Sequence, residues 1–136
     1  MVKVIYGTKG TGKTKQMLKE VNETVLKAKG NVVYLTDTSE HSLEIKHQVR
    51  YINTKDYAIN SEDRLIGMLA GLISGNTDIE YIYIDGAARM SVKTIDEMPA
   101  LYAYMGRLCE EFGVRFVVTV SAAIENIPDF IKQYIK

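Results

Sequence analysis

Short apolar runs alternate along the chain with longer stretches in which apolar residues recur every three or four positions. Continuous apolar runs are typical of strands buried on both faces of a sheet, and they occupy residues 2–6, 31–36, 49–53, 80–85 and 114–121. Helical patterns lie at residues 12–29, 60–74, 98–112 and from 126 onward. This alternation predicts an α/β fold, a three-layer α/β/α sandwich with a mainly parallel sheet of about five strands.

The apolar positions also predict which face of two helices is buried. In helix 12–29 the apolar face consists of Met17, Leu18, Val21, Val25 and Ala28. Helix 98–112 follows Thr94-Ile95-Asp96-Glu97, which has the S/T-x-x-E form of a capping box. Its apolar stripe is expected to belong to the core and consists of Met98, Leu101, Tyr102, Met105, Leu108, Cys109 and Phe112.

Helix 60–74, which Asn60 or Ser61 should cap, carries a glycine at every fourth position. These glycines are Gly67, Gly71 and Gly75. A glycine inside a helix costs about 1 kcal/mol relative to alanine. We expect close packing inside the molecule to offset this cost, and a face for a second subunit is the alternative. The apolar stretch is too short for a membrane helix with this spacing.

Composition excludes several functions. The 136 residues suit one domain, residues 1–136. Lys plus Arg and Asp plus Glu both number 17, so no overall charge directs the chain to nucleic acid or an anionic membrane. The single cysteine, Cys109, allows no internal disulfide. Together with the absence of a signal-peptide pattern, this predicts a cytoplasmic protein.

Residues 7–14 read Gly-Thr-Lys-Gly-Thr-Gly-Lys-Thr, which is the phosphate-binding loop or Walker A motif, G-x-x-x-x-G-K-[ST]. A predicted strand precedes the motif and a predicted helix follows it, as the motif requires. Backbone N–H groups of the loop and the positive end of the helix dipole can hold a phosphate. Lys13 is expected to reach the β- and γ-phosphates, and the Thr14 hydroxyl to bind Mg²⁺. The predicted nucleotide-binding residues here are Gly7, Thr8, Lys9, Gly10, Thr11, Gly12, Lys13 and Thr14.

Asp85, at the end of apolar run 80–85, is the candidate for a Walker B aspartate. A carboxylate at the end of a strand beside the phosphate loop can hold Mg²⁺ through water. Asp37 is the second candidate, but it follows helix 12–29 too soon for the usual order of elements. We therefore predict Lys13 and Asp85 as catalytic residues, Thr14 and Asp85 as metal ligands, and ATP and Mg²⁺ as the bound species.

With these two motifs, the chain resembles the P-loop NTPases over most of its length. It is most similar to their RecA-like and AAA-like branch, in which an extra strand separates the phosphate-loop strand from the Walker B strand. The resemblance implies the P-loop NTPase fold. It also implies a polar residue near the end of the strand after Walker B that senses the γ-phosphate. Ser121 fits that position best, and Thr119 is the alternative.

The chain departs from this branch directly after Asp85. Efficient ATPases of the branch usually carry a glutamate there that activates the attacking water, whereas this chain has Gly86-Ala87-Ala88. Glu97 and Glu125 are the remaining candidates for that role. A charge-neutralising arginine would be Arg89, Arg107, Arg115 or one from another subunit. We therefore expect a small ATP- and Mg²⁺-binding protein that hydrolyses ATP slowly or on stimulation by a partner.

Two other functions stay open. One is a nucleotide-dependent regulatory switch with little turnover, in a homo-oligomer or with a protein partner. The other is a small-molecule kinase of the nucleoside type, with the His41 and Glu44 segment or the glycine-rich helix shaping an acceptor pocket. His41, Glu44 and His47 stand three apart, whereas zinc-binding histidines on a helix usually stand four apart, so we favour a solvated loop or short helix there. GTP is disfavoured because D-x-x-G and a later N-K-x-D are missing.

Overall fold

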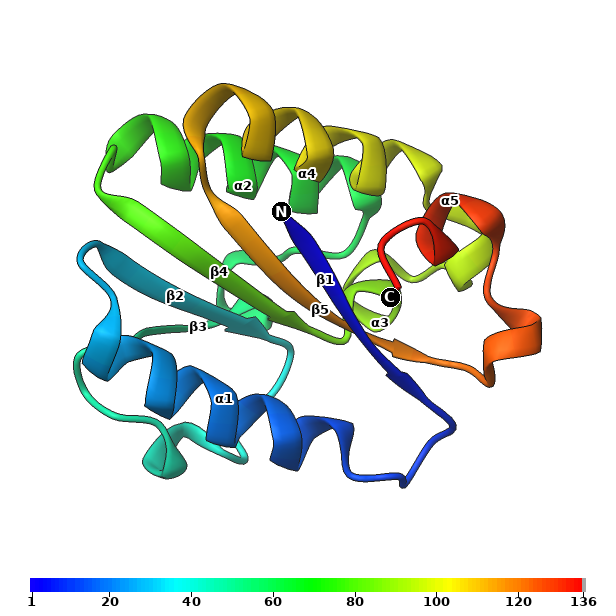
Figure 1. The fold of residues 1–136 in the computed structure, drawn as a ribbon, viewed down its shortest axis with the longest axis horizontal. Coiled ribbons are helices and arrows are strands. Elements are labelled where there is room, and N and C mark those ends of the chain that lie inside the picture. The colour runs from blue at the N-terminus through cyan, green and yellow to red at the C-terminus, as the bar shows by residue number, and fades with distance from the viewer. Residues whose placement is uncertain (136) are drawn as a thin grey trace.

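The computed structural model describes residues 1–135 and has three layers, with one parallel sheet between two layers of helices (Figure 1). The five strands of the sheet are ordered β1-β5-β4-β2-β3, and every pairing between them is parallel. Their bounds are Val2–Gly7 (β1), Asn31–Thr36 (β2), Arg50–Asn53 (β3), Ile79–Asp85 (β4) and Arg115–Ser121 (β5). The predicted α/β sandwich is therefore confirmed.

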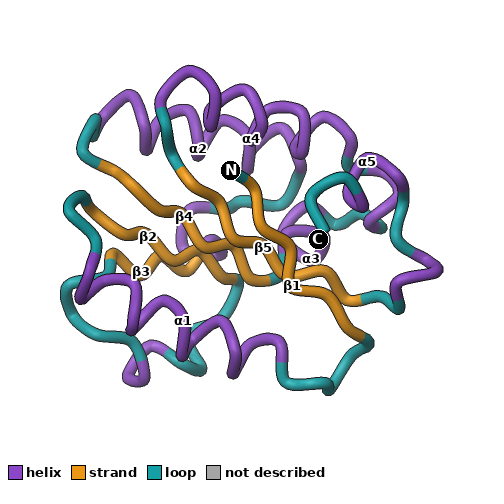
Figure 2. The backbone as a smooth tube through the Cα atoms, in the orientation of Figure 1, coloured by secondary structure: helices purple, strands orange, loops and turns teal. Residues whose placement is uncertain are grey.

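The helices divide unequally between the two faces of the sheet (Figure 2). Helix α1 (Lys13–Lys27) covers one face, while α2 (Glu62–Gly75) and α4 (Pro99–Phe112) cover the other. The short helices α3 (Ala87–Ser91) and α5 (Asp129–Lys132) lie on the same side as α2 and α4. Single 3-10 turns occupy Ser42–Glu44, Thr54–Tyr57, Ile95–Glu97 and Ile124–Asn126. No helix in the described part of the chain is long and apolar enough to cross a membrane.

Side chains of each strand alternate between two cores, because successive residues of a strand point to opposite faces of the sheet. In β4, Ile82 and Ile84 join the core under α2 and α4, whereas Tyr83 joins the core under α1. The apolar face predicted for α1 is confirmed. Met17, Leu18 and Val21 are buried there, and Val25 and Ala28 are partly buried.

A row of stacked tyrosines crosses three neighbouring strands beneath α1. Tyr34 of β2 lies in register with Tyr51 of β3 and Tyr83 of β4. Its ring centroid lies 5.9 Å from that of Tyr51 and 6.4 Å from that of Tyr83. Burial raises the pKa of Tyr83 to about 12, and its hydroxyl forms a 2.8 Å hydrogen bond with that of Thr24. The three rings therefore form one packed layer between the sheet and α1.

Three local predictions differ from the structure. The capping box of Thr94 and Glu97 opens the 3-10 turn Ile95–Glu97, and α4 begins only at Pro99. Phe112, predicted in the core, is 58% exposed because it lies in the last turn of α4, beyond the edge of the core. Helix α3 has no counterpart in the predicted elements, because its five residues are too few to show a helical period.

The predicted internal packing of the glycines in α2 is wrong. A Cβ atom built on Gly67, Gly71 or Gly75 would meet no atom within 4 Å apart from its chain neighbours and the nearby backbone of its own helix. The three glycines lie on the exposed side of the helix, while Leu65 and Leu69 face the core. Close approach inside the molecule therefore does not account for them, and contact with a second subunit stays a prediction.

Candidate nucleotide-binding site

The predicted phosphate loop connects the end of β1 to the start of α1 at the carboxyl edge of the sheet. Gly12, the residue before α1, has φ +86°, a left-handed conformation that glycine adopts without strain. The carbonyl oxygen of Thr8 accepts hydrogen bonds from Thr11 Oγ1 at 2.7 Å and from Lys13 Nζ at 3.0 Å. These two hydrogen bonds link residues at the start and the end of the loop, and they hold the Lys13 ammonium group against the Thr8 carbonyl oxygen.

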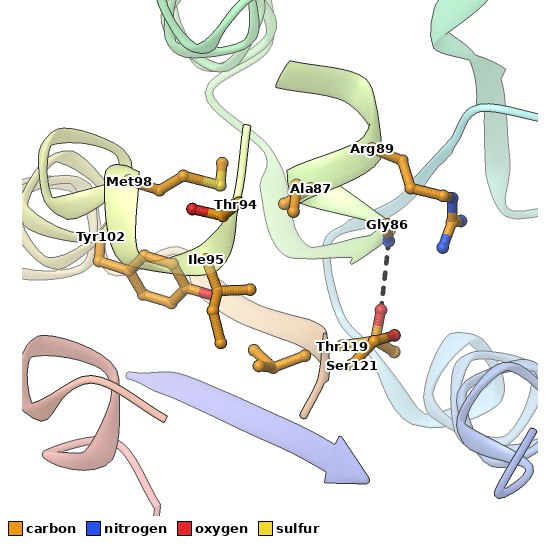
Figure 3. Close-up of a pocket in the computed structure, with 11 residues that line it drawn as sticks. Gly86, Ala87, Arg89, Thr94, Ile95, Met98, Tyr102, Thr119 and Ser121 are labelled. Atoms are coloured by element: carbon orange, nitrogen blue, oxygen red, sulfur yellow. Dashed lines mark hydrogen bonds between the residues drawn. The ribbon is translucent and has the colours of Figure 1, made fainter. Parts of the chain in front are cut away.

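Asp85 is the centre of a hydroxyl network at the end of β4. Its Oδ2 accepts hydrogen bonds from Thr14 Oγ1 at 2.8 Å and from the Tyr34 hydroxyl at 3.4 Å. Its Oδ1 accepts one from Thr119 Oγ1 at 2.8 Å. Thr119 Oγ1 in turn accepts from the backbone N–H of Gly86 at 3.2 Å, the bond drawn in Figure 3. Asp85 therefore links the first turn of α1 to strands β2, β4 and β5.

Burial and charge make this carboxylate a suitable ligand for a cation. Asp85 is only 4% exposed, and among residues 1–135 no lysine or arginine forms an ion pair with it. Burial, and next the Asp85 carboxylate, raise the pKa of Tyr34, so this phenol keeps its proton and donates it. Hydroxyl and carboxylate oxygens are the hard ligands that Mg²⁺ prefers. Thr14 and Asp85 thus fit the predicted metal site.

A cavity of about 350 Å³ opens in front of the loop and of Asp85. Lys13 and Thr14 from the first turn of α1 contribute to its wall, and Ser121 contributes from the end of β5. The complete wall consists of Lys9, Gly10, Gly12, Lys13, Thr14, Asp85, Arg89 and Ser121. Of the remaining predicted loop residues, Gly7, Thr8 and Thr11 shape the loop without lining the cavity. We call this cavity the phosphate pocket.

The order of the strands around this pocket agrees with the extra-strand arrangement. β5 lies between β1, which leads into the loop, and β4, which ends in Asp85. Similarity to a solved structure points to the same architecture. The chain aligns with the flagellar accessory protein FlaH from Methanocaldococcus jannaschii with a TM-score of 0.60 and 14% sequence identity. The two proteins share a fold.

That fold is RecA-like, and at this identity the likeness shows the fold alone. The alignment covers 97% of this chain and 65% of the FlaH chain, so the chain spans about two thirds of the solved protein. The sequence matches no protein-family model and no curated protein.

Asp37, the second Walker B candidate, binds an arginine instead of the phosphate loop. Its two carboxylate oxygens accept hydrogen bonds from Nε of Arg89 at 3.2 Å and from Nη2 at 3.0 Å. These bonds raise the pKa of the Arg89 guanidinium. The contact with Thr14 belongs to Asp85, so the geometry favours Asp85 for the metal.

The three arginines left open by the sequence have different surroundings. Arg89, in α3, borders the phosphate pocket. Arg107 pairs with Glu111 one turn further along α4, with 3.0 Å between Nε and Oε1, and both side chains are exposed. Arg115 stacks over the ring of Tyr81 at the opposite end of β5. Within this chain, only Arg89 of these three lies where it can reach a bound phosphate.

Neither candidate for a water-activating glutamate lines the phosphate pocket. The Glu97 carboxylate accepts hydrogen bonds from the backbone N–H and the hydroxyl of Thr94, and these bonds lower its pKa. Glu125 lies exposed in the turn after β5. Among the described residues of the pocket wall, Asp85 is the single carboxylate.

The polar segment after β2, predicted as a solvated loop or short helix, contains the single 3-10 turn Ser42–Glu44. His41 and Glu44 pair with each other at its surface. No cluster of three His, Cys, Asp or Glu side chains suited to a metal occurs between residues 1 and 135. Neither this segment nor the glycines of α2 line the phosphate pocket, and an acceptor pocket for a kinase stays a prediction.

Tyr34 is the contact of Asp85 that the sequence analysis did not identify. The feature of the sequence that could have indicated this contact is the alternation of side chains along a strand, which repeats every two residues. Tyr34 precedes Thr36 by two positions, and Thr36 is in register with Asp85, so the three side chains share one face of the sheet.

Proposed function

We propose that the protein binds ATP with Mg²⁺ and hydrolyses it slowly, or efficiently only with a partner. The 2.8 Å hydrogen bond between Thr14 Oγ1 and Asp85 Oδ2 carries this proposal. It brings the hydroxyl of the Walker A motif and the carboxylate at the end of β4 together beside Lys13, in a pocket large enough for a phosphate chain.

Each part of the pocket has a role in binding. The backbone N–H groups around Gly10 and Gly12, at the positive end of α1, attract the phosphates. Lys13 exchanges its hydrogen bond with the Thr8 carbonyl for the β- and γ-phosphate oxygens. Thr14 and Asp85 hold the metal, which neutralises phosphate charge when bound. Thr119 and Tyr34 keep the Asp85 carboxylate in place through their hydrogen bonds.

Slow turnover follows from the composition of the pocket wall. Asp85 accepts hydrogen bonds from three hydroxyls and is the proposed metal ligand. The described wall contains no second carboxylate that could orient a water molecule. Arg89 is held by Asp37, so its charge is partly neutralised. A partner that supplied either group would accelerate hydrolysis. The description of FlaH as an accessory protein supports a search for a protein partner.

Calorimetric titration with ATP and Mg²⁺ tests the binding part of the proposal. Lys13→Ala should abolish measurable binding, because it removes the ammonium group that contacts the phosphates. Lys15→Ala is the matched control, since Lys15 is exposed two residues further along α1 and does not line the pocket. Unchanged affinity of the Lys13 variant would contradict the proposal.

The alternative of a regulatory switch is favoured by Arg89. This side chain borders the phosphate pocket and is bound to Asp37, so a nucleotide phosphate and Asp37 compete for one guanidinium. Steady-state phosphate release separates the two functions. Turnover near or above about 1 per second, ordinary for an enzyme, excludes a pure switch, whereas binding without phosphate release supports it.

A further inference from the structure

A second cavity of about 290 Å³ lies beside the phosphate pocket, between β5, α3 and the start of α4 (Figure 3). Arg89 and Ser121 line both cavities. Its volume lies near the lower end of the range for small-molecule sites. ATP and Mg²⁺ are proposed to bind in the phosphate pocket, and this proposal places no ligand in the second cavity.

Tyr102 is the feature of this cavity that points to a ligand. Its side chain extends from α4 beside Ile95, with the hydroxyl end toward the cavity (Figure 3). Tyr102 is only 3% exposed, and its hydroxyl forms no hydrogen bond with any of residues 1–135. The hydroxyl is not among the buried polar atoms without a partner, which in residues 1–135 comprise Ser91 Oγ alone, so it is accessible from the cavity and free to donate to a molecule there. Burial raises the pKa of this phenol, so its proton is available to donate.

The Tyr102 ring is held in this orientation from behind. Phe130 contacts it edge to face, with 5.8 Å between ring centroids. Tyr134 stacks on it at 6.3 Å. Both contacts come from the C-terminal segment that contains α5. The hydroxyl is thus directed before any ligand arrives, which lowers the entropy lost on binding.

The remaining wall indicates an uncharged ligand. Ile95, Met98 and Val120 supply apolar surface. The hydroxyl of Thr94 already donates to Glu97, and that of Thr119 to Asp85. No acidic residue among the described residues lines the cavity, and its one cation, Arg89, is already paired with Asp37. Transfer of an ion into such a wall would leave its charge without a partner.

We propose that this second cavity binds a small, uncharged organic molecule of about the size of one substituted ring. A carbonyl or ether oxygen of this molecule accepts a hydrogen bond from the Tyr102 hydroxyl. Its apolar part packs against Ile95 and Met98. The site is a ligand site in its own right and does not require nucleotide.

Methyl NMR on the full chain labelled at its methionines tests the site directly. The probes are benzamide and acetanilide, uncharged rings with a carbonyl oxygen, and the titration is done without nucleotide. Both should shift the Met98 methyl signal saturably, because Met98 lines the cavity. Met17, buried under α1 on the other face of the sheet, should not respond. No shift of Met98 with either probe at millimolar concentration would overturn the proposal.

A conservative variant tests the role of the hydroxyl. Tyr102→Phe keeps the ring and its contacts with Phe130 and Tyr134, and should weaken benzamide binding about tenfold, as expected for one buried hydrogen bond. Toluene, which lacks an acceptor, should bind the two proteins equally. Equal benzamide affinity for both proteins, or tighter binding of the anion benzoate than of benzamide, would contradict the assignment. Because these titrations contain no nucleotide, a negative result would contradict the second ligand site without affecting the Lys13→Ala test of ATP binding.

Discussion

Asp37 and Arg89 are joined by two hydrogen bonds, although 52 positions separate them in the sequence. Asp37 follows β2, while Arg89 belongs to α3, the short helix after Asp85. The pair lies at the border of the phosphate pocket, because Arg89 forms part of its wall. A phosphate bound in this pocket would therefore meet a guanidinium whose charge is already shared with a carboxylate.

Removal of the Asp37 charge should strengthen ATP binding. Asp37→Asn weakens the hold on Arg89 and frees its guanidinium for the phosphates, so the affinity measured by calorimetry should rise about tenfold, the value of one charge-assisted hydrogen bond. Arg89→Ala should weaken binding. In the double variant the gain from Asp37→Asn should disappear. A full gain in the absence of Arg89 would show that Asp37 acts by repulsion alone.

The contact between Thr14 and Asp85 predicts how ATP affinity depends on Mg²⁺. Thr14→Val removes the hydroxyl but keeps the shape of the side chain, so the gain in ATP affinity on adding Mg²⁺ should become smaller, with Asp85 as the remaining protein ligand. Thr14→Ser keeps the hydroxyl and should retain the dependence. Calorimetric titrations in Mg²⁺ and in EDTA measure both. A Val variant whose response to Mg²⁺ is as large as that of the unchanged protein would remove Thr14 from the metal site.

The backbone conformation of Val92 predicts that a substitution at this position stabilises the protein. Its φ is +54°, a left-handed conformation that costs an ordinary residue about 1–2 kcal/mol and suits a β-branched side chain least. The side chain is 76% exposed, so little packing is lost on replacement. Val92→Asn should raise the free energy of unfolding by about 1 kcal/mol, because asparagine tolerates this conformation. Urea denaturation measures the change.

Leu26→Asn provides the control for Val92. Leu26 is also apolar and exposed, but it lies within α1, where asparagine is a poor helix former. This substitution should lower the free energy of unfolding. A gain in both variants would mean that exposed apolar surface, not backbone conformation, explains the effect.

Glu80 predicts a stability contribution that depends on pH. Its Oε1 accepts hydrogen bonds from the backbone N–H groups of Lys29 and Gly30, both at 2.9 Å, and the bond from Gly30 is the main cause that lowers the Glu80 pKa below its ordinary value of 4.5. Because the folded-state pKa is the lower one, the contribution is complete above about pH 4.5 and is lost as pH falls through the folded-state pKa.

Glu80→Gln should therefore lower the urea midpoint at pH 7. The difference from the unchanged protein should shrink as pH falls below 4.5 and through the folded-state pKa. Midpoints measured at several pH values across this range test the sign. A difference of the same size at the lowest pH would mean that shape, not charge, gives Glu80 its role.

The order and type of the long elements could be predicted from the sequence because each has a periodic pattern of its own. Helix α1 was predicted from Met17, Leu18 and Val21, and these residues are buried as expected. The sequence predicts Asn60 or Ser61 as the cap of α2, and in the structure the cap is Ser61, whose side chain accepts from the N–H of Arg64. Patterns within a few residues carry this information, since helices and caps are local structures.

Contacts between distant segments could not be predicted in the same way. Thr119 and Ser121 point to the same face of β5, and only the register of β5 against β4 determines which of them meets Asp85. The pairing of Asp37 with Arg89 depends on α3, which is too short to have a pattern. The exposure of Gly71 depends on how α2 is rotated against its neighbours. Each of these features follows from the assembled sheet and not from local sequence.

The position of β1 in the sheet has a consequence for how the protein is made. β1 is the first strand of the chain, and among the described strands it pairs only with β5, the last. On the ribosome, the phosphate loop therefore emerges long before its supporting strand has a neighbour. Bringing the two strands together closes a loop that spans most of the chain, which is entropically costly and slow. Arrival of β5 joins β1 to the rest of the described sheet and places Thr119 against Asp85, so the proposed binding site forms only at this late step.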